Sequence, residues 1–191
     1  HCIPADSQIC LCGMTLSVRS WIRIGDWKDG ETLYRHDVPI SQSYVVENNL
    51  ATTLCLQNRN EQCRQHLERS IELAPFDWYN WSMLSRLNEF EGNEKEAMID
   101  YQLAIENGRD ESAYERLALL YLFVKQSPQD AAQLVQTGVS YYPNNSELWV
   151  ILAVSRYQLQ ENVLAERAAR QAYQIDPSER IKAVLFAIVH G

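Results

Sequence analysis

Five cysteines and four histidines are the side chains of this sequence with the clearest potential for chemistry. Cys10-Leu11-Cys12 lacks the two-residue spacer that separates paired zinc ligands, and no second pair stands opposite it. The histidines have no Cys or carboxylate at ligand spacing; they are His1, His36, His66 and His190. The sequence therefore predicts no metal site and no cofactor.

Catalytic motifs are also missing from the sequence. It contains no Gly-rich phosphate loop, no Gly-x-Ser-x-Gly and no His-Glu-x-x-His. The acidic residues from Glu89 to Glu96 fall at an expected turn and helix start, where the helix macrodipole favours negative charge. We therefore expect this chain not to be an enzyme. A lone enzyme is the alternative from a different class, and a cluster of His or carboxylate groups with perturbed pKa values in a cleft would identify it.

Cys55 and Cys63 are eight residues apart and are expected on either side of a tight turn between two helices. At that spacing a disulfide and two small buried thiols are both physically reasonable. The odd number of cysteines, three of them within the first twelve residues, does not resemble a disulfide framework. We favour two buried thiols.

Composition narrows the class of protein. The 191 residues are 46% apolar, which excludes intrinsic disorder, and no apolar run reaches the roughly 18–20 residues of a membrane span. The 25 acidic and 17 basic side chains give a net charge of −8. That charge argues against nucleic acid and against an anionic membrane surface as partners, because both require a basic protein surface.

An internal period of about 34 residues determines the expected fold. Pro143 and Pro177 are one period apart, Pro75 lies two periods before Pro143, and Arg109 stands where the intervening proline is missing. The same step links three further series: Cys63, Ala97, Ala131 and Ala165; Ser70, Ala104, Gly138 and Ala172; and Leu50, Leu84, Ala118 and Leu152. Each period holds one helical segment with large apolar residues, a short break, and a second helical segment with small residues seven apart. Small residues at those positions allow two helices to approach closely.

These periods resemble the tetratricopeptide repeat from about Tyr44 to Glu179. The Trp-Leu-Gly-Tyr series of that family corresponds here to Trp81, Leu84, Ser85 and Asn88, and again to Trp149, Leu152, Ala153 and Arg156. The resemblance implies an all-α solenoid, a right-handed superhelix of antiparallel helix pairs. Its four units are expected at residues 44–77, 78–111, 112–145 and 146–179.

The flanking segments are expected to extend the array. Residues 21–43 are predicted to be a partial repeat, a second helix over 27–38 that Pro39 closes. Residues 180–191 are predicted to be a capping helix, whose apolar surface makes a homodimer one alternative. Residues 1–20 are an N-terminal segment, with the tail of a truncated membrane helix as one interpretation.

The same resemblance implies a non-catalytic scaffold that binds a protein or peptide in the groove lined by its first helices. The family's groove positions correspond to Asn49, Thr52, Tyr79, Ser82, Met83, Arg86, Glu89, Phe90, Glu115, Arg116, Val150 and Tyr157. No lysine occupies them, which argues against a clamp for the terminal carboxylate of a chaperone. Their mixture of aromatic, aliphatic and amide groups favours an extended peptide or a helix.

Residues 19–51 resemble, in addition, the junction where membrane proteins of the transmembrane-and-tetratricopeptide-repeat type leave their last span. The matching residues are Arg19 or Arg23, Trp27, Asp29, Leu33, Tyr34, Pro39, Ser41, Asn49 and Leu50. This resemblance implies that the chain is the extracytoplasmic arm of a glycosyltransferase-like membrane protein. The alternatives are a free-standing cytoplasmic adaptor and a self-assembly module.

Overall fold

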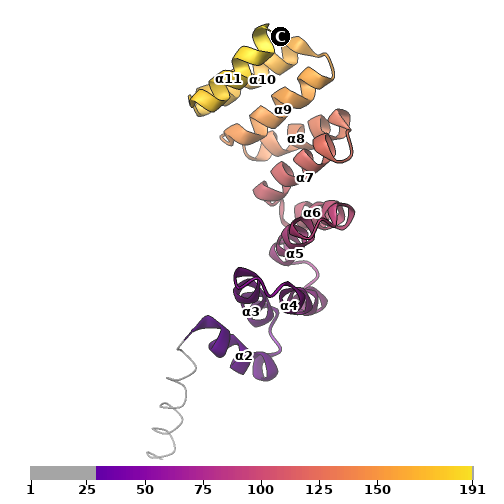
Figure 1. Cartoon of the computed structure of the whole chain (residues 1–191), viewed down its shortest axis with the longest axis vertical. Coiled ribbons are helices and arrows are strands. Elements are labelled where there is room, and N and C mark those ends of the chain that lie inside the picture. The colour runs from indigo at the N-terminus through magenta and orange to yellow at the C-terminus, as the bar shows by residue number, and fades with distance from the viewer. Residues whose placement is uncertain (1–28, 191) are drawn as a thin grey trace, which may run out of the picture. The chain divides into compact units, whose positions relative to one another are not determined.

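The computed structural model describes residues 29–190, and this part of the chain is built from helices without a strand. The chain divides into two compact units, residues 1–74 and residues 75–191, which are described separately below. Figure 1 labels the helices α2 to α11. None of the helices in the described part combines the length and apolar character needed to cross a bilayer. The expectation of an all-α chain is confirmed.

The N-terminal unit contains three helices: α2 (Gly30–Ser41), α3 (Tyr44–Leu56) and α4 (Asn60–Leu73). The Asp29 side chain caps α2 by accepting a hydrogen bond from the Thr32 amide at 2.8 Å. The contact between α3 and α4 is dry and close, since its residues are 0–1% exposed: Leu50, Ala51, Leu54, Cys63 and Leu67. Ser70 Oγ donates to the Tyr44 carbonyl at 2.8 Å and ties the far end of the same pair.

Helix α2 differs from the predicted segment at its C-terminal end. It continues through Pro39 to Ser41 instead of closing at Pro39, and Gln42 then ends it in the left-handed region. A proline this close to the end of a helix costs one amide donor without disrupting a long run of turns, so the helix tolerates it. The part of the predicted partial repeat before Asp29, and the whole N-terminal segment, lie outside the described residues.

Cys55 and Cys63 form a disulfide, so the prediction of two separate thiols is wrong. The turn between α3 and α4 brings their Cα atoms to 5.3 Å. Asn58 adopts a positive φ of 59°, and the Arg59 amide donates back to the Leu54 carbonyl at 3.0 Å. This tight reversal places the last turn of α3 beside the first turn of α4 and so brings the two sulfur atoms within bonding distance of each other.

Glu31 attaches α2 to the α3–α4 pair. Its carboxylate accepts hydrogen bonds from Arg35 at 2.7 Å and from Arg59, at the start of α4, at 2.6 Å. The two guanidinium groups lower the pKa of Glu31 from 4.5 to about 2. A lowered pKa in the folded state means that the ionised carboxylate stabilises the folded form at neutral pH.

We expect this stabilisation to be complete above the unfolded-state pKa and to be lost as the pH falls from about 4.5 through about 2. Hydrogen exchange of the α2 amides, corrected for intrinsic rates, measures the loss of attachment. The Glu31→Gln variant should show weakened protection of α2 already at neutral pH and little further change on acidification. Wild-type protection of α2 in that variant would contradict the assignment.

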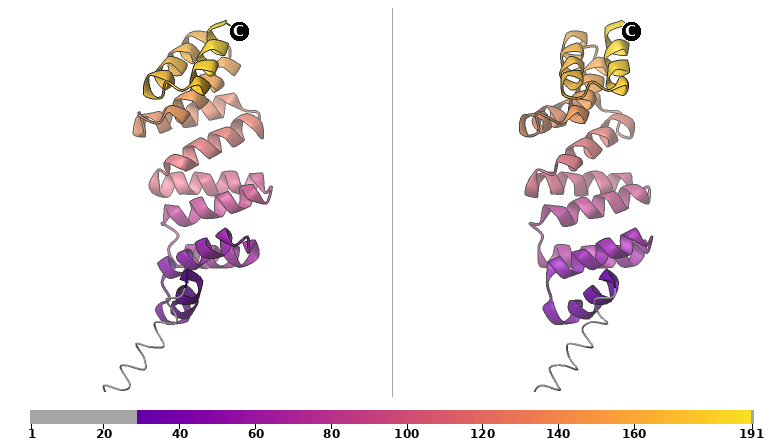
Figure 2. Two further views of the ribbon diagram at one scale, coloured as in Figure 1. Left: turned by 60° about the vertical axis from the view of Figure 1, so that its left-hand side comes forward. Right: turned by 90° about the vertical axis from the view of Figure 1, so that its left-hand side faces the viewer.

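The C-terminal unit continues with seven helices, and Figure 2 shows successive antiparallel pairs stacked against each other within it. They are α5 (Trp78–Phe90), α6 (Glu94–Gly108), α7 (Glu111–Phe123), α8 (Pro128–Tyr141), α9 (Ser146–Gln158), α10 (Asn162–Ile175) and α11 (Glu179–His190). Asp77, Asp110 and Asn145 cap α5, α7 and α9. Each first helix therefore begins at a short polar side chain that follows the preceding break.

Residues one or two periods apart make the same contacts in this unit. The indole nitrogens of Trp81 and Trp149 donate to the carbonyls of Pro75 and Pro143, at 2.8 and 2.9 Å. The small residues seven apart are buried between helices: Ala97, Ala104, Ala131, Gly138, Ala165 and Ala172. Gly108 permits a further close approach, because a Cβ at that position would lie 2.1 Å from the ring of Trp78. The 34-residue period of the sequence thus corresponds to side-chain contacts that recur from repeat to repeat.

Candidate functional site

A cleft between α5 and α7 is the site with the clearest binding character in the C-terminal unit. It is lined by Arg86, Glu89, Phe90 and Arg116, and its volume is about 440 Å³. All four residues belong to the groove set predicted from the sequence. The cleft combines two guanidinium groups, one carboxylate and an aromatic ring that is 73% exposed.

Glu89 fixes the geometry of this cleft. Its carboxylate accepts a hydrogen bond from the Tyr101 hydroxyl at 2.8 Å and forms a two-point ion pair with the Arg116 guanidinium. Burial of Tyr101, reinforced by the adjacent Glu89 charge, raises the pKa of that phenol to about 12. Glu89 in turn raises the pKa of Arg116. The raised pKa values keep the Tyr101 phenol protonated and the Arg116 guanidinium charged throughout the neutral range.

Arg86 leaves more of its hydrogen-bonding capacity to the cleft. One terminal nitrogen donates to Ser112 Oγ at 2.9 Å, across the boundary between α5 and α7. A guanidinium carries five N–H donors in a planar fork. The arrangement can therefore accept a carboxylate or a peptide carbonyl beside the exposed Phe90 ring.

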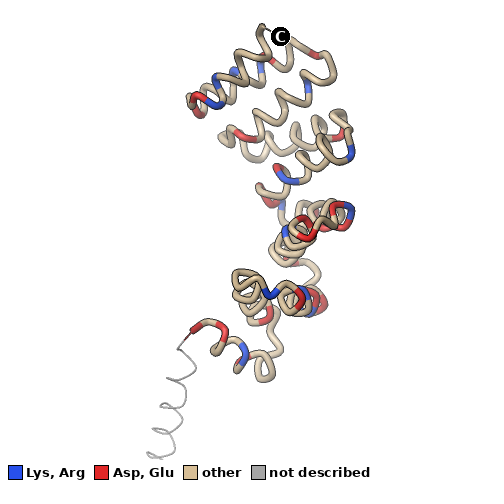
Figure 3. The backbone as a smooth tube through the Cα atoms, in the orientation of Figure 1, with Lys and Arg blue, Asp and Glu red and all other residues tan. Residues whose placement is uncertain are grey.

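Polar contacts also join other successive first helices. Ser82 Oγ donates to Asp110 at 2.5 Å, and Asn145 Nδ2 donates to both Glu111 and Glu115, at 2.7 and 2.6 Å. Burial raises the pKa of Glu115, and the nearby charges of Glu147 and Glu111 add to that shift. Figure 3 shows acidic and basic residues interspersed along the helices of this unit. The face formed by the first helices α5, α7 and α9 thus carries charges of both signs, and hydrogen bonds join its neighbouring helices.

The other predicted groove residues are dispersed in the structure. Tyr79 is exposed in the first turn of α5, Met83 is partly buried further along α5, and Tyr157 is exposed near the end of α9. Asn49 and Thr52 are partly buried on α3, in the N-terminal unit.

Ser82 and Val150 are buried, contrary to the expectation that they line an open groove. The hydrogen bond to Asp110 covers Ser82, and Val150 packs with Ala172 and with Ile181 of α11. Helix α11, which follows the last repeat, therefore covers Val150, a position that an isolated repeat would leave exposed.

Further exposed aromatic residues lie near the cleft residues in the chain. Phe123 ends α7 and is 68% exposed, and Phe76 lies just before α5. Phe90 and Phe123 both stand as the last residue of a first helix, so the period itself indicates their equivalence. Sequence reasoning missed Ser112, Tyr101 and Asn145 as residues that contact the site or join its helices. A separation of 26–28 residues links Arg86 to Ser112, Glu89 to Arg116 and Ser82 to Asp110. This spacing is the signal that identifies such cross-helix pairs.

Within residues 29–190 the structure contains no group of three or more His, Cys, Asp or Glu side chains arranged to hold a metal ion. The three N-terminal cysteines, Cys2, Cys10 and Cys12, lie outside the described residues.

Comparison with known proteins identifies the fold. No family model and no curated protein matches the sequence. The structure is similar to YrrB, described as a TPR protein with an unusual peptide-binding site, with a TM-score of 0.71 and 15% identity over 84% of this chain and 83% of that one. It is similar to MamA of Desulfovibrio magneticus, with a TM-score of 0.64 and 15% identity over 84% of each chain. It is also similar to PilF of Pseudomonas aeruginosa, with a TM-score of 0.64 and 14% identity over 77% of this chain and 68% of that one. The chain thus has the tetratricopeptide fold, as the sequence predicted.

Proposed function

We propose that this chain is a non-catalytic scaffold that binds a segment of a partner protein on the first-helix face of its C-terminal unit. The observation that carries the proposal is the cleft lined by Arg86, Glu89, Phe90 and Arg116. Arginine and aromatic side chains dominate the binding energy of protein interfaces. Here Ser112 and Glu89 position the two arginines of the cleft, and the Phe90 ring is exposed beside them. The similarity to YrrB, whose description names a peptide-binding site, supports the same role.

The chemistry of the cleft indicates the kind of peptide that fits it. Arg86 offers donors to a carboxylate, and Phe90 offers an apolar surface next to them. Arg116 is already neutralised by Glu89, so the pair limits how much negative charge the cleft accepts. We therefore propose a ligand with one acidic side chain adjacent to an aliphatic or aromatic one.

A peptide array tests this proposal directly. The probes are short peptides that contain one Asp or Glu next to Leu or Phe, and matched peptides that contain Lys in place of the acid. We expect the acidic probes to bind, and Arg86→Glu or Phe90→Ala to weaken binding by about tenfold or more without lowering Tm. Arg170→Glu is the matched control, because it reverses the same charge on α10, where Arg170 pairs with Glu166. Equal binding by wild type and Arg86→Glu would place the site elsewhere.

The Cys55–Cys63 disulfide supports a proposal about compartment. Structural disulfides persist in oxidising environments and are rare in the cytosol of most organisms. Together with the resemblance of residues 19–51 to a membrane-protein junction, this favours a scaffold that works as the extracytoplasmic arm of a membrane protein. Protease treatment of intact cells that carry a C-terminal epitope tests the orientation. Loss of the epitope supports an outside location, and full protection contradicts it.

A further inference from the structure

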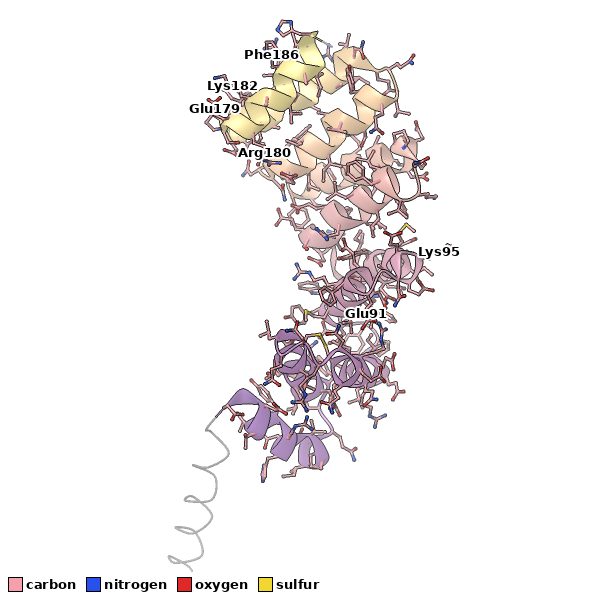
Figure 4. All side chains as sticks on the ribbon, in the orientation of Figure 1. Glu91, Lys95, Glu179, Arg180, Lys182 and Phe186 are labelled. Atoms are coloured by element: carbon pink, nitrogen blue, oxygen red, sulfur yellow. A yellow bond between two sulfur atoms is a disulfide. The ribbon has the colours of Figure 1, made fainter. Side chains whose placement is uncertain are left out.

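Helix α11 has one buried face and one exposed face. Ile181 and Ile188 are buried against the preceding helices, and Val184 and Leu185 pack beside them. Arg180 pairs with Glu147 of α9 and fixes the start of α11. The outer face carries Glu179, Ala183, Phe186, Ala187 and His190, all exposed. Figure 4 labels Glu179, Lys182 and Phe186 on this helix.

Helix α9 carries the same face one repeat period earlier, and there another helix covers it. Ala183, Phe186 and Ala187 stand one period after Trp149, Leu152 and Ala153 of α9. In α9 that row packs against α10, and Leu152 and Ala153 share a buried cluster with three α10 alanines: Ala165, Ala168 and Ala169. The corresponding row of α11 has no helix over it within residues 29–190, and Phe186 is 66% exposed. The outer face of α11 is therefore shaped for helix packing.

We propose that this face pairs with α11 of a second copy of the chain, in antiparallel orientation about a two-fold axis. Glu179, Ala183, Phe186 and His190 are spaced by four, three and four residues, which is the seam spacing of a two-helix coiled coil. The two-fold axis crosses the outer face at the level of the helix midpoint, halfway along the chain between Val184 and Leu185. In this register each Phe186 faces Ala183 of the other copy. Each Glu179 likewise faces His190 of the other copy.

Both sets of pairs are complementary. A large ring meets a small side chain, so the helices can approach closely around the ring. An acidic residue meets a histidine at each end, and the antiparallel helix dipoles add to the attraction. The partner is therefore identified by self-complementarity of shape and charge, as an interface with two-fold symmetry requires. A chain of net charge −8 has no general tendency to associate with itself, so the local pairing must provide the specificity.

The size of the helix sets the strength of the interaction. Twelve residues span about 18 Å, and one helix pair of that length buries less than the roughly 1,200 Å² of a standard stable interface. We therefore expect a dimer that forms at high concentration and dissociates on dilution.

Sedimentation equilibrium of the 191-residue chain measures this association. Cys2, Cys10 and Cys12 are replaced by Ser in all samples so that intermolecular disulfides do not contribute. The average mass should rise from 22.1 kDa toward twice that value as the concentration approaches about 500 µM. Phe186→Glu should abolish the rise. Phe123→Glu, at an equally exposed ring on α7, should leave it unchanged. A monomer at every concentration, or an undiminished dimer with Phe186→Glu, would overturn the proposal.

A charge exchange tests the antiparallel register. Glu179→Lys and His190→Glu should each weaken the dimer about fivefold, because each places like charges or two bases at both ends of the pair. The double variant places a lysine opposite a glutamate at each end, so the basic and acidic positions are reversed, and it should restore association to about the wild-type level. Additive weakening in the double variant would exclude this register. The test is independent of the α5–α7 cleft, since none of these residues lines it.

Discussion

Removing the disulfide between Cys55 and Cys63 is expected to lower the free energy of unfolding of the α3–α4 pair by about 2–3 kcal/mol. The crosslink closes a loop with a sequence separation of eight residues, and the loss follows from the larger conformational entropy of the open unfolded chain. The turn itself retains its backbone hydrogen bonds, including Arg59 N to Leu54 O, so the folded pair should keep its geometry. The effect is therefore one of stability rather than shape.

Hydrogen exchange of the buried amides in α3 and α4 measures this loss, with the Cys55→Ala/Cys63→Ala variant compared with wild type. Exchange at Leu54 and Leu67 should accelerate by about 30- to 150-fold if these amides exchange by unfolding of the pair. The same variant is the control for reduction. A reducing agent should accelerate exchange in wild type and leave the variant unaffected, which separates this disulfide from the N-terminal cysteines. Unchanged protection in the variant would mean that the bond contributes nothing to stability.

The sequence predicted the fold because the repeat is a repeat of contacts. Trp81 and Trp149 are two periods apart, and each donates the same hydrogen bond to a proline carbonyl. Small residues at fixed positions lie between helices for the same reason. Such local regularities are legible in one sequence, since each unit packs mainly against its neighbours.

The disulfide could not be predicted in the same way. A spacing of eight residues is compatible with two thiols on opposite sides of a turn, and the difference depends on a few ångströms of backbone geometry. Asn58, in the left-handed region, provides the reversal that joins them. The same left-handed conformation recurs one period apart in the later breaks, at Gly92, Gln126 and Gln160, so the turn belongs to the repeat. The period does not indicate whether two cysteines on either side of such a turn are bonded, because only this turn carries them.

The candidate site was predictable only in part. Helical position placed Arg86, Glu89, Phe90 and Arg116 on one face, and the structure gathers them around one cleft. Position alone did not reveal that Glu89 and Arg116 neutralise each other, which changes the charge the cleft offers a ligand. It also failed at Val150, because a residue on α11 covers that side chain. Predicting a pairing between successive repeats requires the angle by which one repeat is rotated relative to the next. That angle is set by how the helices pack.

Leu148→Ala is expected to lower the free energy of unfolding of the C-terminal unit by about 3 kcal/mol. Leu148 is 0% exposed in the first turn of α9 and belongs to the cluster that joins α7, α8, α9 and α10. Truncation removes buried apolar surface and leaves a cavity between helices that pack along their whole length. Chemical denaturation monitored by circular dichroism measures the change. Leu164→Ala is the control, because that leucine on α10 is 42% exposed and its truncation should cost much less.

Gly138 provides a test of whether the cavity is the cause. A Cβ on Gly138 would lie 3.4 Å from the end of Leu148 and 3.2 Å from the ring of Tyr114. In wild type a methyl group there is crowded by both side chains. After Leu148→Ala the space is open on one side, so Gly138→Ala should recover part of the lost stability, helped by the roughly 1 kcal/mol preference of a helix for alanine over glycine. The recovery should exceed the effect of Gly138→Ala in the wild-type background. Equal effects in the two backgrounds would mean that the two positions are not coupled. The small residues of the period would then reflect helix spacing alone, whereas coupling shows that each one is matched to a particular large side chain on the next helix.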